Sequence, residues 1–185
     1  RDNRMKSKGF EKDILAFGYA GEAGVNKIVK DRKEDLKEYF KTSFLDKIIT
    51  DLSDTSKMFE IASETLEPWS FVKVGEQGIL ASLYTVAKQR NKGLVLRLKD
   101  IPVKQSTIEI CEFYSLDPYR LLSDMGFIFC DNALRTLENL GKKGFKTVHI
   151  GYLTGTLDKI IIDKEEIQYI DRPSRDEIYK VMEEL

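Results

Sequence analysis

Histidine and cysteine are scarce in this 185-residue chain, and each shortage argues against a class of protein. The single histidine, His149, has no cysteine or histidine neighbour at ligand spacing, so we expect no metal site. The two cysteines, Cys111 and Cys130, lie in apolar contexts and are too few for a disulfide scaffold. We therefore expect both to be small buried side chains in a protein of the reducing cytoplasm.

Long apolar runs and an excess of one charge are also missing. No run approaches the length that crosses a bilayer, and no signal peptide is recognisable, so we expect no membrane association. The 30 lysines and arginines balance 31 aspartates and glutamates, and the two signs alternate along the chain. Because a nucleic-acid surface needs clustered basic residues, we expect no nucleic-acid partner.

Apolar periodicity predicts alternating strands and helices after a polar leader or linker over residues 1–12. Strands are predicted over residues 14–17, 69–74, 93–98, 127–130, 147–153, 159–162 and 167–170. Helices are predicted over residues 22–40 with a break near 31–33, and over 42–52, 53–66, 78–88, 107–114 and 132–141. Ser174 and Glu177 have the spacing of a capping box for a terminal helix. The pattern predicts an α/β (α+β) fold, a mixed sheet packed with helices.

The stretch from Trp69 to Lys88 reads as a buried strand, a glycine turn and an amphipathic helix. The turn, Gly75 to Gly78, would present unpaired N–H groups and the positive end of the helix dipole to an anion. Lys73 would add a counter-charge on the strand before it. Alternatively, Glu76 or Gln77 caps these donors and no ligand binds.

A second glycine cluster, at Gly18, Gly21 and Gly24, has neither Rossmann nor Walker spacing, and tight turns alone explain it. No nucleophile and base can be paired, because Ser82, Ser123 and Thr154 lack a nearby histidine in sequence.

Several segments resemble the C-terminal domain of the aminoimidazole ribonucleotide (AIR) synthetase superfamily. They are Gly78–Lys88, Ile101–Val103, Glu109–Cys111 and Leu116–Ser123. The superfamily includes that purine enzyme, selenophosphate synthetase, thiamin-monophosphate kinase and the E-type hydrogenase maturation protein. The tail, Ile150–Thr154 and Tyr169–Tyr179, is most similar to the hydrogenase-maturation branch, and the likeness spans about residues 13–180.

The resemblance implies that residues 13–185 form one domain and that an N-terminal ATP-binding domain is absent from this chain. The first residue, Arg1, agrees with a piece of a longer protein. ATP and Mg²⁺ would be bound only by the full-length protein, and the partner would be its N-terminal domain or a second copy in a homodimer. This domain would close one side of a cleft, with seven residues near the substrate or anion: Lys73, Gly75, Glu76, Gln77, Gly78, Gly21 and Gly24.

The chain departs from the family pattern at three places, which leaves open whether it is part of an enzyme. Lys73 replaces an acidic residue and Gln77 a glycine, and the change of charge at residue 73 would repel a metal ion. Met125 stands at a glycine position of a second family turn. The C-terminal cysteine that serves the hydrogenase maturation enzyme as carbamoyl carrier is missing. Two hypotheses follow: one half of an ATP-dependent enzyme, or a catalytically degenerate binding or regulatory module.

Overall fold

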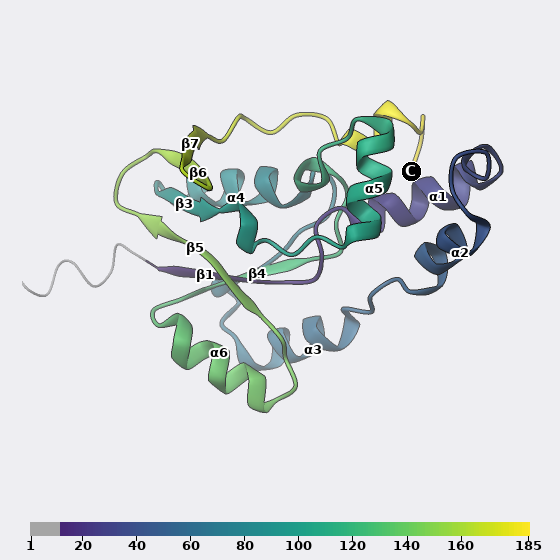
Figure 1. Ribbon diagram of the computed structural model, residues 1–185. Coiled ribbons are helices and arrows are strands. Elements are labelled where there is room, and N and C mark those ends of the chain that lie inside the picture. Colours follow the sequence, from purple (N-terminus) through teal and green to yellow (C-terminus); the bar gives the residue numbers. More distant parts are fainter. Residues whose placement is uncertain (1–11) are drawn as a thin grey trace, which may run out of the picture.

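The computed structural model of the protein describes residues 12–185 and arranges them around a seven-stranded mixed sheet (Figure 1). The strands are β1 (Asp13–Phe17), β2 (Phe71–Lys73), β3 (Gly93–Arg97), β4 (Gly126–Cys130), β5 (Val148–Thr154), β6 (Lys159–Asp163) and β7 (Glu166–Tyr169). Their order is β2-β4-β1-β5-β3-β6-β7, and only β3 and β6 pair in parallel. The predicted leader lies outside the described residues except for Lys12.

Six α-helices accompany the sheet in the described part of the chain. They are α1 (Glu22–Leu36), α2 (Thr42–Thr50), α3 (Ser56–Thr65), α4 (Gly78–Gln89), α5 (Gln105–Tyr114) and α6 (Ala133–Lys142). The predicted break in the first helix is confirmed at Arg32, whose φ of −108° and ψ of 16° are not helical. None of the described helices is long and apolar enough to cross a bilayer.

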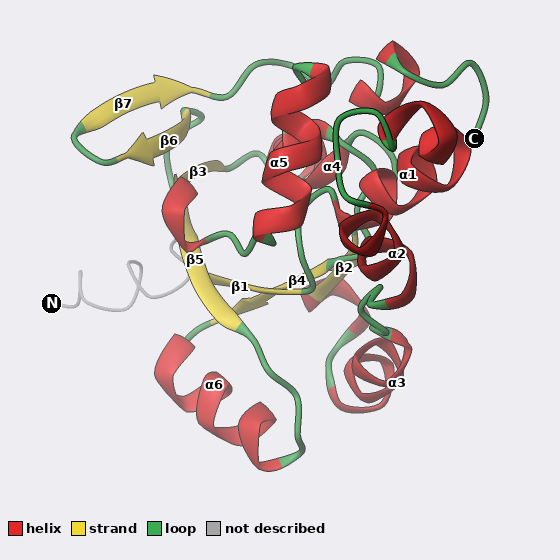
Figure 2. Cartoon of the chain, turned by 45° about the vertical axis from the view of Figure 1, so that its right-hand side comes forward, coloured by secondary structure: helices red, strands yellow, loops and turns green. Residues whose placement is uncertain are grey.

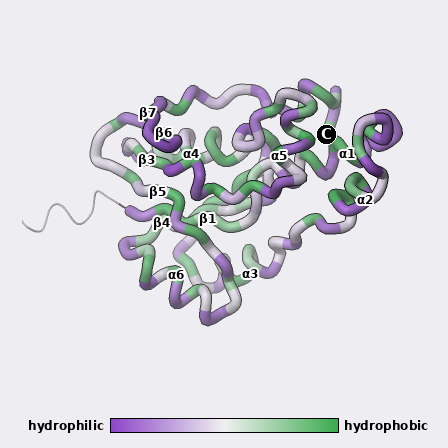
Figure 3. The backbone as a smooth tube through the Cα atoms, viewed as in Figure 1, coloured by the Kyte–Doolittle hydropathy of each residue, from purple (hydrophilic) through white to green (hydrophobic). Residues whose placement is uncertain are grey.

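Helices cover both faces of the central strands. Alternation along β1 sends Ile14 and Ala16 to the face that packs on α4, and Leu15 and Phe17 to the face that packs on α3 and α6. Figure 2 shows these two layers on opposite sides of β1 and β4, and in Figure 3 the same strands are mostly hydrophobic. A third apolar cluster joins α1, α2 and α5 beside the sheet. The predicted α/β fold with a mixed sheet is confirmed.

Two local predictions are wrong. The strand before α4 is a three-residue edge strand, and Trp69 lies before it in a 3₁₀ turn with its side chain 55% exposed. The C-terminal segment forms a 3₁₀ turn, Glu177–Lys180, and its cap is Asp176, not Ser174. The Glu177 carboxylate accepts the backbone N–H of Asp117 at 3.1 Å, so a contact distant in sequence replaces the predicted capping box.

Two leucine substitutions test which face of β1 is buried against the α3–α6 layer. Leu15 is fully buried between the sheet and the α3–α6 layer, whereas Leu134 on α6 is 81% exposed. We expect Leu15→Ala to lower the free energy of unfolding by about 2–5 kcal/mol, because the lost methyl groups leave a cavity. Leu134→Ala should change it by no more than about 0.5 kcal/mol. Urea denaturation measures both values, and equal losses would contradict the assignment of faces.

Candidate functional site

Three turns meet at the end of the sheet where β1 and β2 finish and β4 begins. Ser123 joins them. Its hydroxyl accepts the N–H of Gly21 at 2.7 Å and donates to the carbonyl of Leu121 at 2.7 Å. Its backbone N–H donates to the carbonyl of Gly75 at 3.1 Å. The structure therefore brings together the two glycine turns that the sequence predicts for the site, and it gives Ser123 a bridging role.

Glycine is needed at Gly21 and Gly78 because backbone approaches backbone there. Gly78 has a φ of 76°, and a Cβ on it would lie 2.4 Å from the carbonyl oxygen of Tyr119. Gly21 has a φ of 72°, and its Cβ would lie 2.9 Å from the carbonyl oxygen of Pro118. Close packing of turns accounts for both glycines without a ligand.

The remaining predicted site residues lie around this centre in different environments. Gly24 is buried against the Leu121 side chain, and Gly75 has open space where a side chain would begin. The Lys73 ammonium lies 5.0 Å from the centre of the Phe59 ring, on the side of α3. Glu76 is exposed and caps no helix donor among residues 12–185.

The N-terminus of α4 carries a carboxylate from the C-terminal segment. The N–H of Gln77 donates to Asp176 Oδ2 at 2.6 Å, while Asp176 Oδ1 accepts the N–H of Ile178 at 2.8 Å. Asp176 is only 3% exposed. Its negative charge lies where the helix dipole favours an anion. Neither predicted alternative, an open site or a cap from Glu76, describes this arrangement.

A second polar centre lies at the start of α1. The Glu22 carboxylate accepts the N–H of Ser53 and, at 3.2 Å, its hydroxyl. Lys104 Nζ lies 3.2 Å from Glu22 Oε2 and donates to the Asp51 carbonyl at 3.0 Å. These contacts tie the segment between α2 and α3 to α1. Sequence reasoning missed them, because no local motif marks the pairing.

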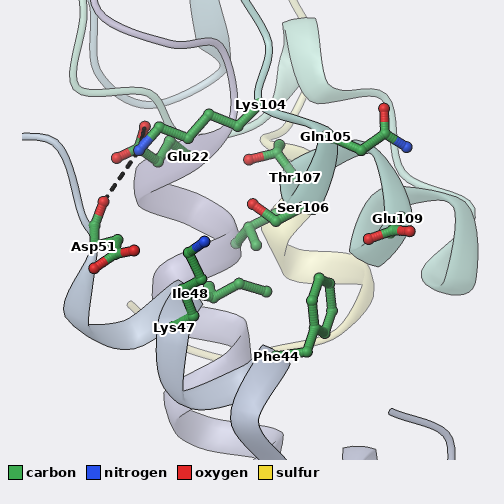
Figure 4. A pocket seen from close by; sticks show the side chains of 11 residues that line it. Glu22, Phe44, Lys47, Ile48, Asp51, Lys104, Gln105, Ser106, Thr107 and Glu109 are labelled. Atoms are coloured by element: carbon green, nitrogen blue, oxygen red, sulfur yellow. Dashed lines mark hydrogen bonds and ion pairs between the residues drawn. The ribbon is translucent and has the colours of Figure 1, made fainter. Parts of the chain in front are cut away.

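Two cavities flank this segment. One of about 440 Å³ lies between α1, α2 and α5 and includes Glu22 in its wall (Figure 4). The other, of about 320 Å³, is lined by residues that include Gly18, Tyr19, Ser53 and Thr55. Both cavities are therefore near the predicted Gly18–Gly24 turn.

Neither cysteine is a ready nucleophile. Burial, helped by the charges of Asp117 and Glu177, raises the pKa of the Cys111 thiol to about 12. Burial also raises the pKa of Cys130. Both thiols are therefore protonated at neutral pH, and a thiol is a much weaker nucleophile than a thiolate. No group of three or more His, Cys, Asp or Glu residues in the described chain could hold a metal ion.

Comparisons with known proteins define the class of fold. No protein-family model and no curated protein matches the sequence. The chain is similar to HypE in a HypE–HypF complex, with a TM-score of 0.68 and 22% identity over 88% of this chain and 53% of that one. It is similar to HypE in complex with ATP, with a TM-score of 0.64 and 14% identity over 90% and 52% of the two chains. It is also similar to AaThiL complexed with AMPPCP and TMP, with a TM-score of 0.55 and 10% identity over 90% and 51%.

The fold is thus one that HypE and AaThiL share, and the fold that the sequence resemblance predicts is confirmed. The TM-scores are higher for the hydrogenase maturation protein HypE than for AaThiL. The chain spans about half the length of the structures that it matches.

The two glycines of the Gly75–Gly78 turn make a matched pair of variants. We expect Gly78→Ala to lower the free energy of unfolding by more than about 2 kcal/mol, because φ is positive and Tyr119 blocks the new methyl group. Gly75→Ala should cost less than about 1 kcal/mol, because its surroundings are open. Thermal and urea denaturation measure both, and a tolerated Gly78→Ala would show that the turns are not packed together.

The Asp176 cap gives a separate prediction. Asp176→Ala removes the acceptor of two backbone donors, so we expect a loss of about 2 kcal/mol or more. Asp171→Ala, at an exposed position of the same segment, should be nearly neutral. In amide NMR spectra the Gln77 signal should shift strongly in the first variant only. An unchanged Gln77 signal in Asp176→Ala would contradict the cap.

Proposed function

We propose that this chain is one half of an AIR synthetase-related, HypE-like protein and forms one side of an ATP and substrate cleft. The observation that carries the proposal is the shared fold, which covers about 90% of the chain and about half of neighbours whose structures contain ATP or AMPPCP and TMP. The other half would be an N-terminal domain of the same protein, or a second copy in a homodimer.

In this proposal the companion domain supplies the contacts to the nucleotide phosphates. The N–H of Gln77, the N-cap residue of α4, is already bonded to Asp176, so it is not available to a phosphate in this conformation. The residues of this chain also do not fit a Mg²⁺ site, because Lys73 replaces the family acid and no described acidic cluster could hold the ion. ATP and Mg²⁺ therefore belong to the companion domain, and this chain contributes the opposite wall.

Gly75 is the residue at which this wall can be tested. It accepts from Ser123 through its carbonyl, yet nothing lies within 4 Å of where its side chain would start. A large side chain there would leave the domain folded and obstruct closure against a companion. Gly141 on α6 has equally open surroundings and lies on the other layer of the structure, so it serves as the matched control.

We expect the longest product of the gene, with residues upstream of Arg1, to bind ATP in the presence of Mg²⁺ in calorimetry. Gly75→Phe should weaken that binding by about tenfold or more, or 1.4 kcal/mol, while Gly141→Phe leaves it unchanged. The 185-residue chain alone should bind ATP far more weakly. Failure of the long product to bind ATP would contradict the proposed ATP cleft.

A second candidate function is a binding or regulatory module that keeps the fold without the chemistry. Two observations favour it: Asp176 occupies the α4 terminus, and the Met125 side chain is fully buried where the family turn has a glycine. A HypE protein has been solved in complex with HypF, so association with another protein is compatible with this fold. A long product that lacks ATP binding but co-purifies with a defined partner would favour this function.

A further inference from the structure

The cavity between α1, α2 and α5 has the features of a ligand site that is separate from the glycine turns (Figure 4). Its volume of about 440 Å³ is within the range of small-molecule pockets. Its lining joins residues from three helices and from the segments around them, which no local sequence pattern connects. Charged and hydroxyl groups form one part of the wall and apolar side chains another.

The N-terminus of α5 opens into this cavity without a cap. Lys104 precedes the helix and gives no side-chain cap, because an ammonium has no acceptor for backbone N–H groups. It pairs with Glu22 and donates to the Asp51 carbonyl. The N–H groups of residues 105–107 have no acceptor in the described part of the chain. Four orphan donors are usual at a helix start, and the helix dipole makes this end attractive to an anion.

The Thr107 hydroxyl is a further donor in the wall of the cavity. Thr107 is 1% exposed, and its hydroxyl has no hydrogen-bond partner among the described residues. Figure 4 shows it directed into the cavity together with the hydroxyl of Ser106. The hydroxyl is not itself a buried unpaired atom, a state that among the described residues belongs to Thr147, so it is reached from the cavity and can donate to a ligand there.

Lys47 brings an uncommitted positive charge to the same place. Its ammonium, on α2, points toward Ser106 and Thr107 in Figure 4 and forms no ion pair with any residue from 12 to 185. Lys33, by contrast, is paired with Asp46 at 2.5 Å. An ammonium, two hydroxyls and three backbone N–H groups thus converge as donors, and a carboxylate or phosphate is the ligand group that accepts from all of them.

The other residues of the cavity wall indicate what kind of molecule carries the anionic group. Phe44 and Ile48 form an apolar side below the donors in Figure 4, and Val25 also lines the cavity. Three carboxylates also line the cavity: Glu22 is already satisfied by Lys104 and Ser53, and Asp51 and Glu109 are the other two. We propose that this cavity binds a small organic anion, a carboxylate or phosphate carried on an apolar or aromatic body. The site is independent of the proposed ATP cleft.

Amide NMR of the 185-residue chain tests the site directly. We expect benzoate, phenyl phosphate or both to shift the signals of residues 105–107 in a saturable way below about 10 mM, and neutral benzyl alcohol to leave them in place. Saturation by benzoate alone identifies a carboxylate ligand, and saturation by phenyl phosphate alone a phosphate. If inorganic phosphate binds as tightly as phenyl phosphate, the apolar wall does not contribute to binding, and the proposal of an organic anion is wrong. No shift with any anion would overturn the site.

Two pairs of variants confirm the location. Lys47→Met and Thr107→Val should each weaken binding of the better probe by about tenfold, because each removes one donor to a charged group. Lys41→Met and Thr42→Val, at exposed positions near the start of α2, should bind as the unchanged protein does. Binding that survives Lys47→Met places the anion elsewhere and overturns the proposal. Lys47 is exposed, so this variant remains decisive even if Thr107→Val fails to fold.

Discussion

The buried hydroxyl of Ser123 holds together the turns at one end of the sheet. It accepts from Gly21 at the start of α1, and the same residue's backbone donates to Gly75 before α4. Because β4 begins three residues later, the hydrogen bonds of Ser123 link the sheet to both helix starts. Gly21 and Gly78, both with positive φ, lie against the backbone of residues 118–120 just before Ser123. The position of α1, and with it of Glu22 in the cavity wall, depends on the same contacts.

The starts of α4 and α5 differ in whether a carboxylate of the protein accepts a backbone N–H there. At α4 the Asp176 carboxylate accepts from Gln77, so the protein supplies its own anion. At α5 no internal acceptor is present among the described residues, and Lys47 and Thr107 add further donors to the open terminus. The attraction of a helix N-terminus for anions therefore stabilises the fold at α4 and leaves α5 able to bind an anion. For this reason we place the proposed anion site at the start of α5 and not at the Gly75–Gly78 turn, which the sequence predicts.

Local patterns were sufficient for most of the architecture. Period-two apolar runs identified the strands, and the predicted helix over residues 132–141 is present as α6, which Asn132 caps by accepting the N–H of Arg135 at 3.0 Å. The contacts that define the site join residues 99 and 102 positions apart, and no local pattern encodes them. Trp69 lies in a turn before the strand, and the prediction failed there because apolar character alone does not mark the residue at which a strand begins. The capping box failed because Glu177 binds Asp117 instead.

Amide hydrogen exchange compares the two helix starts in a single experiment. We expect the N–H of Gln77, which is held by a buried carboxylate, to exchange orders of magnitude more slowly than the N–H groups of Ser106 and Thr107, which have no internal acceptor. Addition of a saturating organic anion should slow exchange at Ser106 and Thr107 and leave Gln77 unchanged. Fast exchange at Gln77 together with protection at residues 106 and 107 before any anion is added would contradict the assignment of a closed and an open terminus.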